Sequence, residues 1–316
     1  MTTIWFILAR AIHFGSCLLF FGAFAFDRLV ATVISTGDEN PASAWWQSRI
    51  RFCGLILLPL ILLSGMAWLA LVAENMGGEP LTMDILKTVW DQTQFGTVCR
   101  WRLIFWLAAA TVLVISIVSK PPRVYGKFLA WLQLLFGGCL LGSLAWAGHG
   151  QESSLCHLCA DVLHLLVAGF WPAGLLPMFL LLRKLRRAGG AEAMNSTFYS
   201  TYLLVRRFSA LSLVSVALLT ATGLVNSWYL VGSLANLSGQ IYGRWLLLKV
   251  GLFVLTVGIG AMNLLRLKPR LSANNPAAQK DEAAARLQFN LQMELLLGAI
   301  IVIVVAILGI LPPAIQ

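Results

Sequence analysis

The sequence predicts an all-α, polytopic membrane protein with about eight transmembrane helices and no sizeable soluble domain. Three observations predict this fold class. Of the 316 residues, 59% are hydrophobic and only 11% are charged, whereas soluble domains carry about 25% charged residues. The mean hydropathy is +0.81. Apolar stretches of about 20 residues, the length that crosses the hydrocarbon core of a bilayer, recur along the whole chain.

Eight stretches are long and apolar enough to be transmembrane helices. They are residues 4–34, 51–73, 97–118, 126–148, 158–182, 207–231, 244–267 and 287–311. The first lacks a basic leading region and a small-residue cleavage site, so we expect it to stay as a helix. Pro59, Pro172 and Pro177 lie inside predicted helices, which membrane helices tolerate when neighbouring groups satisfy the freed carbonyls.

The basic residues predict the orientation of the chain. Seventeen of the 23 Lys and Arg residues lie in the connections after the first, third, fifth and seventh stretches or at the nearby helix ends. Cytoplasmic loops carry such an excess, so we expect both termini on the opposite, outer side. There, the amphipathic stretch 81–90 within the long connection 74–96 predicts a short interfacial helix. The polar, Ala-rich segment 268–286 predicts a helical or mobile linker on the cytoplasmic side.

The net charge of +10 does not indicate nucleic-acid binding, because its distribution fits membrane topology better. No loop has room for a nucleotide-binding domain, and we find no P-loop or phosphorylation-type motif. ATP-driven pumping is therefore not expected. We assign no catalytic residues and do not expect an enzyme.

The two halves of the sequence resemble each other. Ser64-Gly65 in the second stretch corresponds to Thr222-Gly223 in the sixth, and similar matches recur in the same order in the other stretches. A repeat of four spans preserves orientation, so we predict two parallel four-helix repeats, residues 1–150 and 151–316.

Four histidines, all toward the outer side, are the strongest functional signal. They are His13, His149, His157 and His164. Ionisable groups inside membranes are costly and tend to be functional, although histidines that only bond neighbouring helices are the structural alternative. The duplication makes His13 and His164 equivalent, and we expect them to face each other across the repeat interface in one metal pocket.

The start of the fifth stretch concentrates possible metal ligands. On a helix, His157, Asp161 and His164 fall at i, i+4 and i+7 on one face, with Asp161 either a ligand or a group that orients a ligating histidine. Cys156 and Cys159 form a C-x-x-C motif that fits a local disulfide as well as a metal site. Imidazole suits copper, zinc, iron and nickel, and added sulfur ligands favour Cu(I).

Other polar groups inside the predicted helices extend this set. Cys17 lies one turn from His13 and is either a soft ligand or a packing residue. Glu294, Asn226 and Lys249 are possible pathway residues. Glu294 either relays a proton or cation or is hydrogen-bonded structurally, and Lys249 either takes part or extends its charge toward the interface.

The chain resembles the copper resistance protein D (CopD) family over most of its length. The resemblance rests on an ordered set of short motifs. They are His13 with its following glycine, Thr93-x-Phe95-Gly96, Ala147-Gly148-His149, Asp161-x-x-His164 with Trp171, Arg207-Phe208-Ser209, Thr222-Gly223-x-x-Asn226, Tyr242-Gly243 with Lys249, and Asn263. The resemblance implies a bacterial inner-membrane protein that moves copper from the periplasm toward the cytoplasm. It points to His13, His149 and His164 as ligands; the Cys156–Cys159 pair has no counterpart in the family pattern.

The leading hypothesis is a copper permease that captures copper at a periplasm-facing histidine site and needs no ATP. The alternative is a b-type haem protein of membrane electron transfer, because paired histidines on facing helices suit bis-imidazole ligation. A third hypothesis is a sensor or an assembly partner of a periplasmic copper chaperone, which binds copper without transporting it.

Overall fold

The computed structural model describes residues 2–34, 41–78, 80–119, 122–148, 154–188, 194–272 and 275–315. The all-α prediction is confirmed: these residues form helices and short connections, with no strand among them. The long helices are α1 (Thr2–Leu29), α2 (Pro41–Gly77), α4 (Gln94–Val118), α5 (Arg123–Gly142), α6 (Leu155–Ala188), α7 (Met194–Val231), α9 (Ile241–Met262) and α11 (Ala277–Leu308). The short ones are η1 (Ala31–Ile34), α3 (Met83–Gln92), η2 (Ser143–Ala147), α8 (Leu234–Gly239), the π-helical η4 (Asn263–Leu267) and α10 (Lys268–Arg270).

The eight predicted spans are confirmed, since eight helices of the described chain are long and apolar enough to cross a membrane. Three of these helices begin well before their apolar stretches: α2 at Pro41, α7 at Met194 and α11 at Ala277. Hydropathy locates only the part of a helix that suits hydrocarbon. Helix-forming polar residues, such as the Ala-rich start of α11, continue the helix beyond it. The predicted 268–286 linker is therefore mostly helical.

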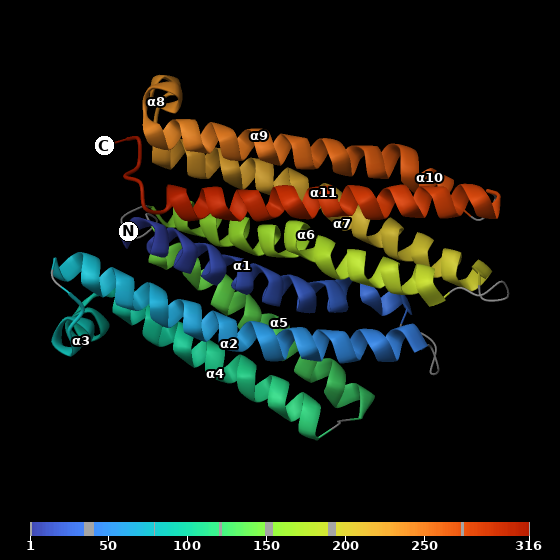
Figure 1. Ribbon diagram of the computed structural model, residues 1–316, viewed down its shortest axis with the longest axis horizontal. Helices are drawn as coiled ribbons and strands as arrows, with labels where there is room; N and C mark the ends of the chain where they lie inside the picture. Colours follow the sequence, from blue (N-terminus) through green and yellow to red (C-terminus); the bar gives the residue numbers. More distant parts are fainter. Residues whose placement is uncertain are drawn as a thin grey trace.

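The long helices run roughly along one axis, and both termini lie at the end that carries α3 and α8 (Figure 1). We call this the terminal end, and the opposite end, which includes α10 and the C-terminal part of α6, the basic end. Many large apolar side chains on the outside are exposed, among them Leu63 at 64% and Leu224 at 68%. Such a surface suits lipid, because water-soluble monomers rarely expose apolar patches of this extent.

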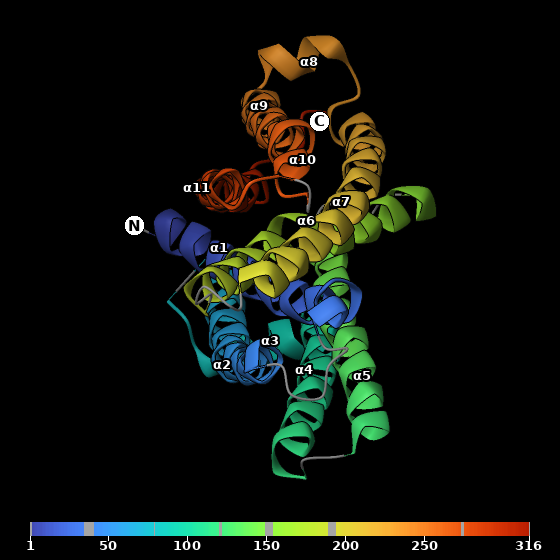
Figure 2. The ribbon, with the colours of Figure 1, turned by 90° about the vertical axis from the view of Figure 1, so that its right-hand side faces the viewer.

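Helices α1 and α6 pack against each other in the centre of the bundle. Figure 2 shows α2, α4 and α5 on one side of this pair and α7, α9 and α11 on the other. A Cβ atom on Gly22 would lie 2.5 Å from the carbonyl oxygen of Gly169 and 2.9 Å from Ala173. Small residues thus let the two backbones approach closely, as is common between membrane helices.

The predicted amphipathic helix at the terminal end is confirmed as α3. Thr82 caps it by accepting a hydrogen bond from the Ile85 amide at 3.3 Å. Thr93 then caps α4 by accepting from the Gly96 amide at 3.0 Å. A Cβ on Gly96 would clash with the Val89 carbonyl, so only glycine fits this close return of the chain. The turn fixes where α4 begins and therefore which of its side chains reach the bundle centre.

Candidate functional site

The first histidine cluster is built around His13 of α1. The ring is buried, its Nδ1 lies 3.0 Å from Oγ of Ser64 on α2, and its Nε2 lies 2.7 Å from Nη2 of Arg102 on α4. A guanidinium can only donate, so Nε2 accepts from Arg102. Ser64 donates its own hydroxyl to the Leu60 carbonyl at 2.6 Å and accepts from Nδ1–H. His13 is therefore neutral, and both of its ring nitrogens are occupied.

Arg102 is a residue of this cluster that the sequence analysis missed. The side chain is buried, and its Nη1 donates to the Leu140 carbonyl and to Ser143 Oγ, both at 2.6 Å. Its Nη2 also lies 3.5 Å from Sγ of Cys17. The guanidinium thus contacts both candidate ligands, His13 and Cys17. Its position within the apolar stretch 97–118 is the signal that could have found it, since a charged residue inside a membrane helix indicates a buried polar network.

A second cation lies beside the first cluster. The Arg10 guanidinium is 4.8 Å from the Trp68 ring and 5.4 Å from the Phe14 ring, a cation–π arrangement. The Trp68 ring is in turn 5.6 Å from the His13 ring. The first cluster therefore holds two guanidinium groups around one neutral histidine, and their charge opposes the approach of a further cation.

The second histidine cluster is built around His164 of α6. Its Nδ1 lies 2.9 Å from Oγ1 of Thr222 on α7. Thr222 donates its hydroxyl to the Leu218 carbonyl at 2.7 Å, so it accepts from Nδ1–H of His164. The lone pair of His164 then lies on Nε2, which has no hydrogen-bond partner in the described part of the chain. This nitrogen is free to bind a metal ion.

A carboxylate lies one helical turn from His164. Asp161 accepts a hydrogen bond from Nδ2 of Asn226 on α7 at 3.1 Å, while Oδ1 of Asn226 is buried without a partner among the described residues. Lys249 of α9 lies within electrostatic range of both Asp161 and His164. The three polar residues that we singled out on different helices of this half are thus brought together around one histidine.

His157 lies two turns before His164 on α6. It is buried to 2% exposure and stacks on Tyr229 with ring centroids 4.8 Å apart. Neither ring nitrogen has a hydrogen-bond partner among the described residues. A buried polar group without a partner costs about 1–3 kcal/mol, and such groups call for a functional or ligand-based explanation. Cys156 and Cys159 beside it are exposed, free thiols.

The expected set is only partly assembled. His149 lies outside the described residues. Among the rest, no three His, Cys, Asp or Glu side chains are close enough to hold one metal ion. The hydrogen-bond partners of His13 lie in the first half of the chain, and those of His164 lie in the second. We therefore describe two clusters rather than one shared pocket.

The two clusters are built alike. Each histidine hydrogen-bonds a hydroxyl side chain that is followed directly by a glycine. Each glycine lies against the histidine ring: a Cβ on Gly65 would be 3.0 Å from Cε1 of His13, and a Cβ on Gly223 would be 3.6 Å from Cε1 of His164. Each cation also lies at the same distance in sequence after a glycine at a tight turn. Arg102 follows Gly96 by the same number of residues as Lys249 follows Gly243. The sequence analysis matched the hydroxyl–glycine pairs but not these two cations.

Glu294 lies in a separate buried network between α9 and α11. Asn263 donates from Nδ2 to Oε1 of Glu294 at 2.6 Å, and Asn290 donates from Nδ2 to Oδ1 of Asn263, also at 2.6 Å. Asn263 begins the π-helical turn η4, a distortion found frequently at functional sites. The network holds a carboxyl group inside the bundle, away from both histidine clusters.

Comparisons with known proteins show which family the chain resembles. The profile for "Copper resistance protein D-like, N-terminal domain" matches residues 1–157, and that for "Copper resistance protein D" matches residues 202–308. Copper resistance protein D of Pseudomonas syringae pv. tomato is 28% identical over 290 residues, which cover 89% of each chain.

Two further relatives extend the comparison. Copper transport protein CutJ of Bacillus subtilis (strain 168) is 31% identical over 169 residues, 51% of this chain and 30% of CutJ. Inner membrane protein YebZ of Escherichia coli (strain K12) is 25% identical over 310 residues, 97% of this chain and 98% of YebZ. No solved structure matches the chain. With both profiles in chain order and relatives aligned along nearly its full length, the chain belongs to the copper resistance protein D family.

Proposed function

We propose that this protein is a copper permease of the bacterial inner membrane that binds copper at its terminal end, through the His164 cluster. Its relatives include a copper resistance protein, a copper transport protein and an inner membrane protein, and their names support this setting. The observation that carries the proposal is the free Nε2 of His164, held in position by the Nδ1–H bond to Thr222 and one turn from Asp161.

The direction of transport follows from the charge distribution. The basic end collects most of the Lys and Arg residues, so it faces the cytoplasm and the terminal end, with both termini, faces the periplasm. A negative interior favours inward movement of a cation by about 2.3 kcal/mol per charge per 100 mV. Copper therefore moves from the terminal end to the basic end without ATP.

The candidate ligands of α6 follow one another along the helix and do not form one complete metal site. Cys156 and Cys159 are exposed at the entrance, and His157 is buried with no described hydrogen-bond partner for either ring nitrogen. Asp161 and His164 follow on the same helix face. Transport requires binding that is strong enough for the ion to enter and weak enough for it to leave. Small donor sets in series meet this requirement better than one complete metal site.

The remaining candidate ligands act at later or alternative steps. His13 and Cys17 bind copper only after Arg102 leaves them, because Arg102 now occupies the Nε2 lone pair of His13. His149, which lies outside the described residues, is a further candidate ligand. Glu294, in its network with Asn263, relays a proton or the cation toward the basic end. A periplasmic copper chaperone delivers copper to the exposed thiols.

We also propose that residues 1–150 and 151–316 are parallel four-helix repeats. The contacts of α1 with α2, α5 and α11 parallel those of α6 with α7, α11 and α5. This exchange of partners is what an axis between α1 and α6 would produce. The matched histidine–hydroxyl bonds at His13 and His164 further support the duplication.

Copper flux into proteoliposomes tests the function. The wild-type chain should carry copper down its gradient, and H164Q should lose about 90% or more of the initial rate, in line with loss of a metal ligand. Leu135→Ile, a change on the lipid-exposed surface of α5, is the control and should transport normally. Copper binding without flux would favour a sensor or assembly role, and a Soret band in the purified protein would favour haem ligation.

A further inference from the structure

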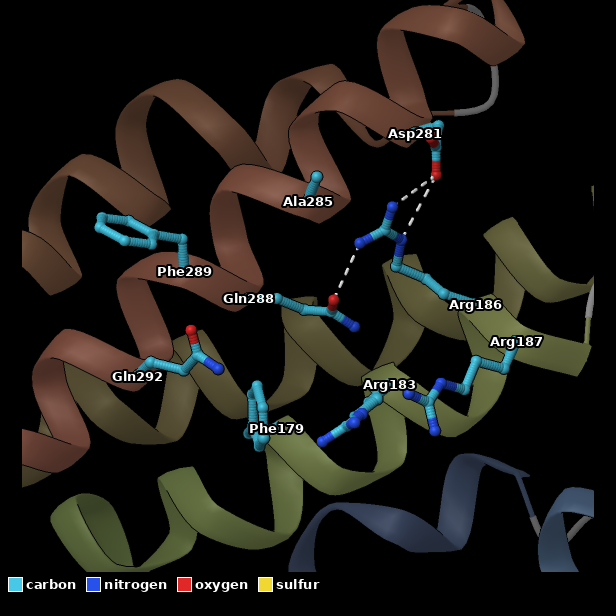
Figure 3. Close-up of a pocket in the computed structure, with 9 residues that line it drawn as sticks. All are labelled: Phe179, Arg183, Arg186, Arg187, Asp281, Ala285, Gln288, Phe289 and Gln292. Atoms are coloured by element: carbon cyan, nitrogen blue, oxygen red, sulfur yellow. Dashed lines mark hydrogen bonds and ion pairs between the residues drawn. The ribbon is translucent and has the colours of Figure 1, made fainter.

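A cavity of about 520 Å³ lies between α6 and α11 at the basic end, far along both helices from the histidine clusters. Three arginines of α6, Arg183, Arg186 and Arg187, line one wall, and residues of α11 line the other (Figure 3). Among the described residues, Asp281 is the only acidic one in this lining.

Arg186 ties the two helices together across the cavity. It donates from Nη1 to Oε1 of Gln288 at 2.8 Å and from Nη2 to Oδ1 of Asp281 at 3.0 Å (Figure 3). The single carboxylate of the lining is therefore already paired with this one arginine.

The other two arginines have no anionic partner within the part of the chain that the structure describes. Arg183 and Arg187 are four residues apart on one helix face, and neither has a hydrogen bond or ion pair to any described residue. Like charges at this spacing repel each other. The cavity thus presents two uncompensated guanidinium groups, which are suited to bidentate contacts with phosphate oxygens.

A buried donor points to the same chemistry. Oε1 of Gln288 accepts from Arg186, but its Nε2 is buried and has no acceptor among the described residues. An unpaired buried N–H group requires an acceptor. An oxygen-rich anion in the cavity would supply one while it also neutralises the arginines.

The apolar part of the lining distinguishes a lipid from a soluble anion. Phe179 and Phe289 line the same cavity, and Phe289 is 59% exposed on the outside of the bundle. A second cavity of about 470 Å³ shares Ala285 and Phe289 and is lined also by Met262. A headgroup at the arginines would therefore continue into acyl chains that lie along an apolar surface.

We propose that this cavity binds the headgroup of an anionic phospholipid. Arg183 and Arg187 bind its phosphate oxygens, Gln288 donates a hydrogen bond to it, and Arg186 holds α6 against α11. Basic pockets between membrane helices recognise acidic headgroups in this way. The lipid would stabilise the packing of α6, which carries His157, Asp161 and His164, on α11, which carries Glu294.

Native mass spectrometry of the purified full-length protein tests the proposal with cardiolipin, phosphatidylglycerol and phosphatidylcholine as probes. The wild-type chain should retain the two anionic lipids and not phosphatidylcholine. R183Q/R187Q should weaken anionic lipid binding about tenfold or more. R206Q/R270Q removes the same charge from exposed arginines of the same end that line neither cavity, and it should bind like the wild type.

Three outcomes would overturn the proposal. Unchanged lipid binding in R183Q/R187Q would exclude this cavity, and equal losses in both double variants would indicate only a diffuse surface charge. Displacement of the lipid by inorganic phosphate at equal concentration would indicate a site for a soluble anion instead. Q288L keeps the arginines and removes the side-chain amide of Gln288, both its unpaired Nε2 and the Oε1 that accepts from Arg186. It should weaken lipid binding less than R183Q/R187Q does. Monodisperse elution from a sizing column verifies that every variant is folded.

Discussion

His13 and His164 make the same hydrogen bond through Nδ1, to Ser64 and to Thr222 respectively, but their Nε2 atoms have different surroundings. Nε2 of His13 accepts from Arg102 at 2.7 Å. Nε2 of His164 has no such partner in the described chain. In the first half of the molecule the Nε2 lone pair of the histidine is therefore occupied by a hydrogen bond, which we call a closed cluster. In the second half the Nε2 lone pair is available, which we call an open cluster.

Helix packing accounts for the difference. In the first half α4 packs against α2, so its cation reaches the histidine that lies between α1 and α2. In the second half α9 packs along α11, and direct packing between α7 and α9 is sparse. Lys249 of α9 consequently interacts electrostatically with Asp161 and His164. It makes no hydrogen bond to Nε2 of His164 like the one that Arg102 makes to His13. We infer that the position of one cation decides whether a cluster stabilises the bundle or binds a metal.

The largest effect is expected when Arg102 is replaced by Met. R102M leaves His13 Nε2, the Leu140 carbonyl and Ser143 without their buried charged donor, and charged hydrogen bonds contribute about 1.5–3 kcal/mol each. The free energy of unfolding should fall by about 3 kcal/mol. Denaturation in mixed micelles measures it, and K249M is the matched control, with a loss of less than half that size. Equal losses would show that Arg102 does not stabilise its cluster more than Lys249 stabilises the other.

The hydroxyl partners give the next effect. T222V removes the acceptor that orients the ring of His164, and loss of such an orienting partner costs about tenfold in metal affinity. S64A removes the matched acceptor of His13 and should leave copper affinity unchanged, because that cluster is closed. Competition with a chromogenic copper chelator measures both. A tenfold loss in S64A with none in T222V would reverse the assignment.

A smaller effect is expected from Lys249. Removing its charge in K249M takes a cation away from the His164 cluster, so copper should bind about threefold more tightly, as expected for partly screened charges. The same titration of wild type and variant detects this change. Weaker copper binding in K249M would instead mean that Lys249 supports Asp161 as a ligand or orients it.

The sequence was sufficient to predict the eight spans and α3, because hydropathy and amphipathic spacing report directly on bilayer crossing and interfacial position. It also matched Ser64-Gly65 with Thr222-Gly223. It did not predict α8, which is too short to leave a periodic pattern, or the early starts of α2 and α7. The contact of Arg102 with His13 depends on how α4 packs against α2, and no local pattern in either helix encodes that.

Equilibrium copper binding to H164Q and H13Q compares the two clusters most directly. Both substitutions keep a side chain that can hydrogen-bond the neighbouring hydroxyl. The account predicts that H164Q loses about hundredfold in copper affinity, the upper end of the range for groups that support a metal ligand, and that H13Q binds copper as the wild type does. A large loss in H13Q, with H164Q unaffected, would contradict it.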